Sequence, residues 1–220
     1  MRILIPLAFI VAAGAAGIIL WPAPKPVPDH AWFASQGAGP APGPVDVIAH
    51  GSGQVTWPPN TLQALQAAVV NGATVLEVDI RRTRDGVLIL RNDATLERTT
   101  NIDGAIAELD WAEVSLADAG ANAVAGRDFS GQGLRIPTLE EALAQFPEAR
   151  WQLEIKPDDA DVAAQVCAVI RARGLEQTAL VASFHDDALN AFRAECPEVA
   201  TSMAQREATR FAVAARLGLS

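Results

Sequence analysis

The sequence predicts an α/β fold built around a parallel β-sheet. From Val45 onward, short β-branched or apolar runs alternate with segments of helical hydrophobic spacing, the pattern of repeated strand–helix–strand units. Half of the 220 residues are hydrophobic and a fifth are charged, which is the balance of a globular protein with a substantial core. A chain of this length has room for one domain, which we expect over residues 45–220.

The predicted elements follow one another along the chain with short connections. The expected strands are Val45–His50, Thr74–Ile80, Val87–Arg91, Trp151–Lys156, Thr178–Phe184 and Ala200–Met203. The expected helices lie near Thr61–Asn71, Thr138–Gln145, Ala160–Arg173, Asp186–Ala194 and Glu207–Leu217. The count of six strands predicts a barrel that stops after about six βα units, with the C-terminal part incomplete.

Polar or charged side chains mark the ends of several predicted strands. They are His50, Glu77 with Asp79, Asn92 with Asp93, and Glu154 with Lys156. Active sites of (β/α)8 barrels are built at the C-terminal ends of the strands. An open, doubly wound sheet would also bind ligands there, but no G-x-G-x-x-G fingerprint follows the first strand. The sequence therefore favours a TIM (β/α)8-type barrel.

An apolar segment precedes the predicted barrel. Residues 3–21 carry no charge after Arg2 and have about the length of 20 residues that spans a bilayer as a helix. The run ends on Trp21 rather than on a small-residue cleavage site, which favours an uncleaved transmembrane anchor over residues 1–21. The positive-inside rule then places the barrel on the periplasmic or extracellular side. Cleavage as a signal peptide is the alternative, and it would give a secreted protein.

Residues 22–44 are rich in proline, which predicts a semi-rigid, extended linker. The prolines are Pro22, Pro24, Pro26, Pro28, Pro40, Pro42 and Pro44. His30, inside this stretch, is expected to be a surface residue.

Charge and cysteine content exclude two classes of protein. A formal net charge of −9 without a basic cluster argues against a nucleic-acid partner, and an anionic substrate would need a cation as mediator. Cys167 and Cys196 match no zinc-binding spacing. They lie on or after neighbouring predicted helices, so a disulfide is feasible in an oxidising compartment, and the sequence leaves its formation open.

Three acidic residues form the candidate metal site. Glu77 and Asp79 lie two apart on one predicted strand and so point to the same face. Each desolvated carboxylate costs several kcal/mol unless it is paired or metal-bound. With Glu154 from a later strand, three carboxylates would suit a hard cation such as Mg²⁺ or Ca²⁺. The alternative is a structural ion pair of Glu77 with Arg81 or Arg82.

Two further residues are candidates for contacts with a substrate. Lys156 shares a face with Glu154, where it would neutralise a phosphate oxygen or simply pair with that carboxylate. His50 ends the first predicted strand and precedes the flexible Gly51-Ser52-Gly53, so it is a candidate general acid or base. A purely structural role is the alternative for His50.

Several segments of the chain, taken in their order and spacing, resemble the glycerophosphodiester phosphodiesterase family. The resemblance runs from about Val45 to Leu217 through VIAHGSG, PPNTLQAL, GATVLEVDIRRTRDGVLIL, NDATLERTT, IPTLEEAL, LEIKP and SFHDDAL. It implies a metal-dependent TIM-barrel enzyme that hydrolyses glycerophosphodiesters, small or lipid-derived, to glycerol 3-phosphate and an alcohol. It further implies one catalytic histidine, a phosphate-side lysine and three metal ligands, which are His50, Lys156, and Glu77 with Asp79 and Glu154.

The chain departs from the family pattern at three positions. Gly51 stands where an arginine is usual, Pro59 where a glutamate is usual, and Asn92 where the family has its second catalytic histidine. Asparagine cannot move a proton at neutral pH, so Asp93 and His185 become candidate replacements. The alternatives to an active hydrolase are therefore a catalytically impaired barrel that binds a phosphodiester, or a truncated relative without function.

Overall fold

The computed structural model describes residues 29–34, 45–52, 56–122 and 126–218. The predicted membrane segment and most of the proline-rich linker lie outside these ranges. Within them, no helix combines the length and apolar character needed to cross a bilayer.

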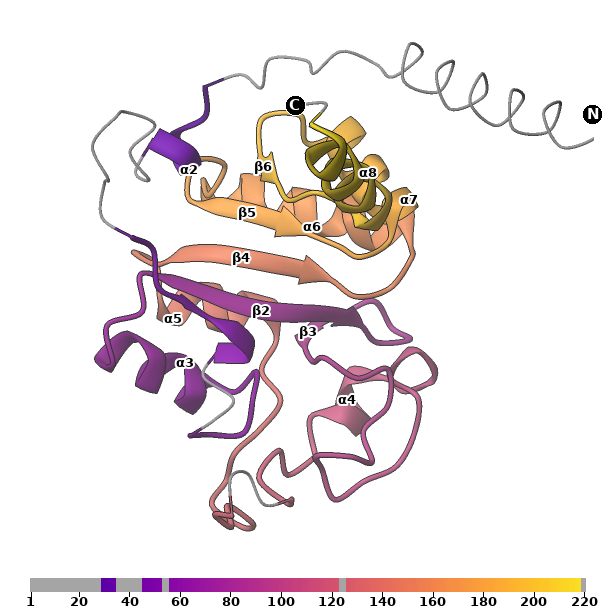
Figure 1. The fold of residues 1–220 in the computed structure, drawn as a ribbon. Coiled ribbons are helices and arrows are strands. Elements are labelled where there is room, and N and C mark those ends of the chain that lie inside the picture. The colour runs from indigo at the N-terminus through magenta and orange to yellow at the C-terminus, as the bar shows by residue number, and fades with distance from the viewer. Residues whose placement is uncertain (1–28, 35–44, 53–55, 123–125, 219–220) are drawn as a thin grey trace, which may run out of the picture.

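Five parallel strands form the sheet that the sequence predicts (Figure 1). They are β1 (Ile48–Ala49), β2 (Val75–Arg82), β4 (Arg150–Ile155), β5 (Ala179–Ala182) and β6 (Ala200–Thr201). Their spatial order is β1-β2-β4-β5-β6, and every neighbouring pair is parallel. The prediction of an α/β fold with a parallel sheet is confirmed.

The third predicted strand belongs to a hairpin and not to the parallel series. β3 (Leu88–Leu90) runs antiparallel to β2, with Ile80 opposite Leu90. The connection is a tight turn in which Gly86 has φ 91° and its N–H donates to the carbonyl of Thr83. Such a short connection reverses the chain, whereas a parallel strand needs a crossover of a dozen or more residues. The expectation of six successive βα units is therefore wrong at this strand.

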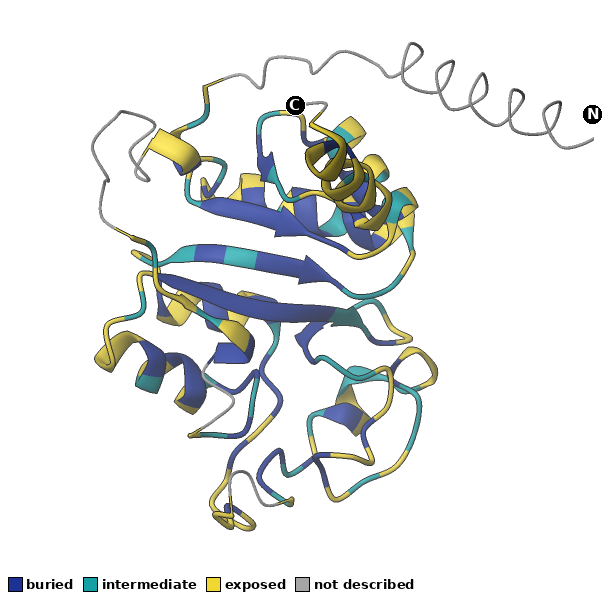
Figure 2. Ribbon diagram, in the orientation of Figure 1, coloured by how far each residue is buried: buried dark blue, intermediate teal, exposed yellow. Residues whose placement is uncertain are grey.

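Helices cover the outer face of the sheet. They are α3 (Leu62–Val70), α5 (Leu139–Gln145), α6 (Ala160–Arg173), α7 (Asp186–Glu195) and α8 (Gln205–Leu217). Thr61, Thr138 and Asp159 begin three of these helices by accepting hydrogen bonds from first-turn N–H groups. Figure 2 shows that the middle strands are almost entirely buried.

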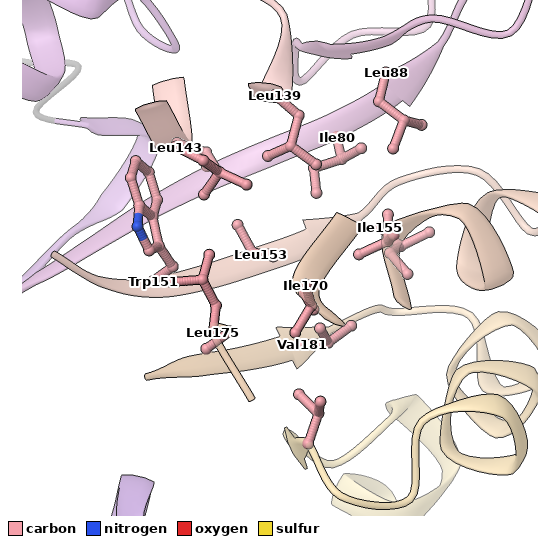
Figure 3. Packing of buried hydrophobic residues seen from close by; sticks show 14 of the residues in the cluster. Ile80, Leu88, Leu139, Leu143, Trp151, Leu153, Ile155, Ile170, Leu175 and Val181 are labelled. Carbon is pink, nitrogen blue, oxygen red and sulfur yellow. The ribbon is translucent and has the colours of Figure 1, made fainter. Parts of the chain in front are cut away.

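Alternate residues of the strands point outward into one large hydrophobic core. Figure 3 shows Ile80 of β2, Leu153 of β4 and Val181 of β5 packed against helix residues such as Leu139 and Ile170. The other residues of the same strands point to the inner face, because side chains alternate along a strand. The inner face is therefore the surface on which Glu77, Asp79 and Glu154 must lie.

A second apolar cluster supports the long connection between β3 and α5. This connection contains a 3-10 helix η2 (Ile106–Glu108) and a one-turn helix α4 (Trp111–Val114). Its buried side chains include Leu96 and Phe129, which pack together around Ile106. The connection lies beside the β2–β3 hairpin (Figure 1).

Cys167 of α6 and Cys196 at the end of α7 are joined by a disulfide, with their Cα atoms 5.8 Å apart. The bridge links two adjacent helices of the outer layer. The question that the sequence left open is thus answered by the packing of these two helices.

Part of the predicted linker is folded onto the domain. Residues 31–34 form a helical turn, α2 (Ala31–Ala34), which lies beside the N-terminal end of β5 (Figure 1). Trp32 is only 2% exposed and packs on the inner face against Val75 and Leu180. The expectation of an extended linker is wrong here, because burying a tryptophan side chain stabilises a local helical turn that the prolines do not interrupt.

His30 helps to hold this turn in place. Its Nδ1 accepts a hydrogen bond of 3.1 Å from the N–H of Trp32, and its Nε2 lies 3.0 Å from the carbonyl oxygen of Glu198. His30 is partly buried rather than a simple surface residue.

Candidate active site

Three carboxylates converge at the C-terminal ends of β2 and β4. The register aligns Asp79 with Glu154, and Glu77 lies two residues earlier on the same face of β2. One carboxylate oxygen from each residue lies within 4.8 Å of those of the other two. All three side chains are buried, with Glu77 completely inaccessible. The structure thus brings together the three predicted metal ligands.

Glu77 is held by backbone contacts from the loop after β1. Its Oε2 accepts a very short hydrogen bond from the N–H of Gly51, and Ser52 Oγ donates to the Glu77 carbonyl at 3.0 Å. Oε1 is buried and has no hydrogen-bond partner in the part of the chain that the structure describes. The alternative of an ion pair between Glu77 and Arg81 or Arg82 is wrong, because Arg82 pairs with Asp159 at 2.7 Å and Arg81 with none of the described carboxylates.

Burial raises the pKa of Glu77 from 4.5 to about 7, and the negative charge of Asp79 acts in the same direction. A carboxyl in this state is only partly ionised at neutral pH. A positive charge close to the three carboxylates would favour the ionised form.

Asn60 orients Asp79 through two reciprocal hydrogen bonds. Its Nδ2 donates to Asp79 Oδ2 at 2.7 Å, and its Oδ1 accepts from the Asp79 N–H at 3.0 Å. Asn60 adopts a left-handed backbone conformation with φ 59°, which asparagine tolerates better than most residues. Asn60 is not among the site residues predicted from the sequence. The signal was its place directly before Thr61, the residue that caps α3.

Lys156 lies between two of the carboxylates. Its Nζ is 2.8 Å from Asp79 Oδ1 and 2.6 Å from Glu154 Oε1. Burial by itself would lower the pKa of Lys156, but the hydrogen bonds and charges of Asp79 and Glu154 together raise it above its usual value. The predicted pairing with Glu154 is present, and the ammonium group partly balances the negative charge.

His50 begins the 3-10 helix η1 (His50–Ser52), and its side chain is exposed. Its neighbour Gly51 has φ 54° and donates the backbone hydrogen bond to Glu77. Glycine adopts this left-handed conformation without the strain that a side chain would bring. His50 thereby stands one residue from a direct contact with the carboxylate cluster.

Asn92 follows β3 and is tied to the inner face of β2. The N–H of the preceding residue, Arg91, donates to the carbonyl of Asp79 at 2.7 Å. Arg81 Nε donates to the carbonyl of Asn92 at 2.8 Å. These contacts keep Asn92 at the mouth of the barrel, at the position where the family has a histidine.

Asp93 and His185, the two candidate replacements for that histidine, lie in different parts of the structure. Asp93 accepts a hydrogen bond of 2.6 Å from Arg98. His185 precedes α7, where its Nδ1 lies 4.0 Å from Asp158 Oδ2. It lines a separate hollow of about 600 Å³ next to Arg206 and other residues of α7 and α8. The structure therefore does not bring His185 into the carboxylate cluster.

The donor set fits a hard divalent cation. Among the described residues, the three buried carboxylates have only the single charge of Lys156 within direct contact, and Glu77 Oε1 has no hydrogen-bond partner. Mg²⁺ and Ca²⁺ prefer oxygen ligands, and a bound cation would remove both the charge imbalance and the unsatisfied oxygen.

The sequence also matches a family model over residues 50–213, that of the glycerophosphoryl diester phosphodiesterase family. The chain belongs to this family. The match begins at the exposed His50 and includes β2, β4 and all three clustered carboxylates.

Individual phosphodiesterases are similar to this chain in sequence over matched segments of different lengths. Glycerophosphodiester phosphodiesterase 1 from Mus musculus is 41% identical over 101 residues, or 46% of this chain and 30% of the mouse protein. A glycerophosphodiester phosphodiesterase from Caldanaerobacter subterraneus is 29% identical over 158 residues, covering 70% of this chain and 63% of the relative. The matched segment thus spans less than two thirds of either protein.

Solved structures of phosphodiesterases share the fold. A glycerophosphodiester phosphodiesterase from Agrobacterium tumefaciens superposes with a TM-score of 0.65 at 28% identity, over 73% of this chain and 67% of that structure. A phosphodiesterase from Oleispira antarctica in complex with the product sn-glycerol-3-phosphate gives a TM-score of 0.60 at 31% identity, over 76% and 71% of the two chains. The parallel sheet described above matches those of these phosphodiesterases.

Proposed function

We propose that the protein is a divalent-cation-dependent phosphodiesterase that hydrolyses glycerophosphodiesters to glycerol 3-phosphate and an alcohol. The observation that carries the proposal is the buried cluster of Glu77, Asp79 and Glu154, in which one carboxylate oxygen has no hydrogen-bond partner from the described segments. Family membership and the product bound to the Oleispira antarctica relative support the substrate class.

Each residue of the cluster has a distinct part in this proposal. The three carboxylates would hold Mg²⁺ or Ca²⁺, which when bound neutralises phosphate charge and orients a nucleophile. Lys156, already placed between Asp79 and Glu154, supplies a further positive charge for a phosphate oxygen. His50 exchanges a proton with the reacting oxygens, since imidazole is the side chain most often used for general acid–base catalysis.

Hydrolysis by the purified full-length chain tests the proposal. Release of glycerol 3-phosphate from glycerophosphocholine should require added Mg²⁺ or Ca²⁺ after EDTA treatment. Glu77→Gln should lower the rate by about 10²-fold or more, because it removes a charged ligand from the cluster. Glu148→Gln, at an exposed position before β4, is the matched control and should leave the rate unchanged. Full activity in EDTA would contradict the proposal.

A second candidate function is binding without turnover. It is favoured by Asn92, which occupies the place of a proton-transfer residue and cannot transfer a proton itself. In that case the protein would bind glycerol 3-phosphate in the presence of a divalent cation and yet release no product from any glycerophosphodiester.

We also propose that the domain lies outside the cytoplasm, anchored through residues 3–21. The Cys167–Cys196 disulfide supports this location, since disulfides persist in oxidising compartments. Carbonate-washed membranes should retain the full chain, and protease added from the non-cytoplasmic side should degrade the barrel domain. Recovery of a soluble protein that begins after Trp21 would instead indicate secretion after cleavage.

A further inference from the structure

Arg81 projects from the inner face of β2 directly above the carboxylate cluster. It follows Asp79 by two residues, so both side chains point to the same side of the strand. The parallel pairing of β2 with β4 ends at Ile80 and Ile155, and Arg81 lies one residue beyond it. The guanidinium is therefore at the mouth of the barrel and not among the paired strands.

The positive charge of Arg81 is not balanced by an ion pair within the described residues. The next arginines along the chain form close ion pairs, Arg82 with Asp159 at 2.7 Å and Arg84 with Asp110 at 2.8 Å. Arg81 has no such pair among the described residues, and its hydrogen bond through Nε to the carbonyl of Asn92 occupies one of five N–H donors. That bond orients the planar group and leaves its Nη atoms available to a ligand.

This unpaired charge is also partly removed from water. Arg81 is partly buried at this position. Arginine remains protonated in proteins. Partial burial of a permanent charge without an ion pair is costly, and an anionic ligand would remove the cost.

A cavity of about 570 Å³ opens beside Arg81. Its other walls include the apolar residues Ala94, Ile106, Ala107 and Pro157 and the charged residues Arg82, Arg84, Asp85 and Asp159. Pro157 directly follows Lys156, so the cavity adjoins the proposed active site. Its lining combines small apolar side chains with both cationic and acidic groups, which suits a polar organic substituent carried by an anion.

We propose that Arg81 binds the phosphate group of the substrate and that the adjoining cavity receives one of the two organic substituents of the phosphodiester. This inference rests on the proposed function for the identity of the substrate. The arginine fork matches two phosphate oxygens, and the bond to Asn92 holds it in one orientation.

Calorimetric titration of the full-length protein with glycerol 3-phosphate and with inorganic phosphate, at saturating Ca²⁺ or Mg²⁺, tests the phosphate contact. Arg81→Gln should raise the dissociation constants of both ligands by about 10- to 100-fold, as expected for the loss of charge-assisted hydrogen bonds. The dissociation constants of Arg81→Lys should lie between those of the parent protein and those of Arg81→Gln. Arg171→Gln, in an exposed ion pair with Glu198 on the outer helices, is the control and should remain within about twofold of the parent.

Two results would overturn the phosphate contact. One is binding of both ligands by Arg81→Gln within twofold of the parent protein. The other is loss of the cation-induced rise in melting temperature in Arg81→Gln, which would mean that Arg81 only supports the carboxylate cluster. A parent protein that binds glycerol 3-phosphate without hydrolysing any diester would contradict the proposed function alone, since the dissociation constants still test Arg81.

A bulky substitution tests the cavity. Ala107 is exposed, so Ala107→Trp should fold normally while filling part of the space. We expect Ala107→Trp to raise the KM for glycerophosphocholine several-fold and to leave the affinity for inorganic phosphate unchanged. An unchanged KM would overturn the assignment of the cavity. An equally large loss of affinity for inorganic phosphate would overturn it as well. If no diester is hydrolysed, competition of glycerophosphocholine with glycerol 3-phosphate supplies the same comparison.

Discussion

Two arginines lie at opposite ends of the inner face of neighbouring strands. Arg150, at the N-terminal end of β4, pairs with Asp46 at 2.6 Å, and its guanidinium lies 4.2 Å from the centre of the Trp32 ring. It also donates to the carbonyl of Trp32 at 2.9 Å. Arg81, at the C-terminal end of β2, has its side chain bound only to the carbonyl of Asn92 among the described residues.

The carboxylates repeat this contrast. Asp46 accepts hydrogen bonds from Arg150 and from Thr74. Glu77, near the other end of the same face, has a raised pKa and one oxygen without a hydrogen-bond partner among the residues described. The N-terminal end thus satisfies its polar groups within the chain, and the C-terminal end leaves them for a ligand. Substitutions at the first end should change stability, and those at the second should change binding and pH dependence.

The largest expected effect is on stability, at Trp32. Trp32→Ala should lower the free energy of unfolding by about 3–5 kcal/mol, because it removes a fully buried aromatic side chain. Urea denaturation of the full-length chain measures this loss, with Phe33→Ala, which is 38% exposed, as the control. A loss below about 1 kcal/mol would show that the N-terminal end does not depend on this turn.

The second prediction concerns the pH dependence of the metal-free protein. Glu77 has a folded-state pKa of about 7 and an ordinary value of 4.5, so between these values the folded chain keeps a proton that the unfolded chain has lost. Its contribution to stability should therefore fall by about 3 kcal/mol as the pH rises through this window, and then level off. Urea denaturation in EDTA, with Glu77→Gln as the reference, isolates the contribution. Equal slopes for the two proteins would contradict the prediction.

The third prediction concerns catalysis at the C-terminal end. Asn92→His should raise turnover of a glycerophosphodiester by about 10²-fold, because it restores a proton-transfer group at the mouth of the barrel. Asn71→His, at the exposed end of α3, is the control. No gain despite intact cation binding would point to Gly51 and Pro59 as the causes of low activity and would favour binding without turnover.

The smallest expected effect is at Asp46. Asp46→Asn weakens the ion pair with Arg150, in which the side chain of Asp46 is 15% exposed and that of Arg150 is 20% exposed. The substitution should lower the free energy of unfolding by about 1–2 kcal/mol. The cation-induced shift in melting temperature should be unchanged. A reduced shift would mean that the two ends of the inner face are coupled. Glu198→Gln, in a more exposed ion pair with Arg171, is the control for a surface charge.

Local patterns in the sequence were sufficient for several features. The alternation of strands and helices predicted the α/β fold, and the period of two predicted that Glu77 and Asp79 share a face. Apolar runs also located β2, β4 and β5 to within a few residues. These features depend on neighbours along the chain, which is why they can be read from sequence alone.

Other features depended on contacts between distant segments. The sequence order places a strand between those of Asp79 and Glu154, but β3 folds back as a hairpin and leaves β4 directly beside β2. Only this pairing brings the two carboxylates level with each other. The reciprocal bonds of Asn60 to Asp79 likewise join residues that lie 19 apart.

The sequence by itself determined which side chains this protein has for binding a cation and which face of the strand carries two of them. The tertiary structure decided that a turn of the proline-rich segment closes one end of the inner face through Trp32. It also decided that Arg150 is neutralised there and that Arg81 is left without an ion pair among the described residues. The reason is physical: side-chain periodicity is a local property, whereas the satisfaction of a buried charge depends on which distant segment packs against it.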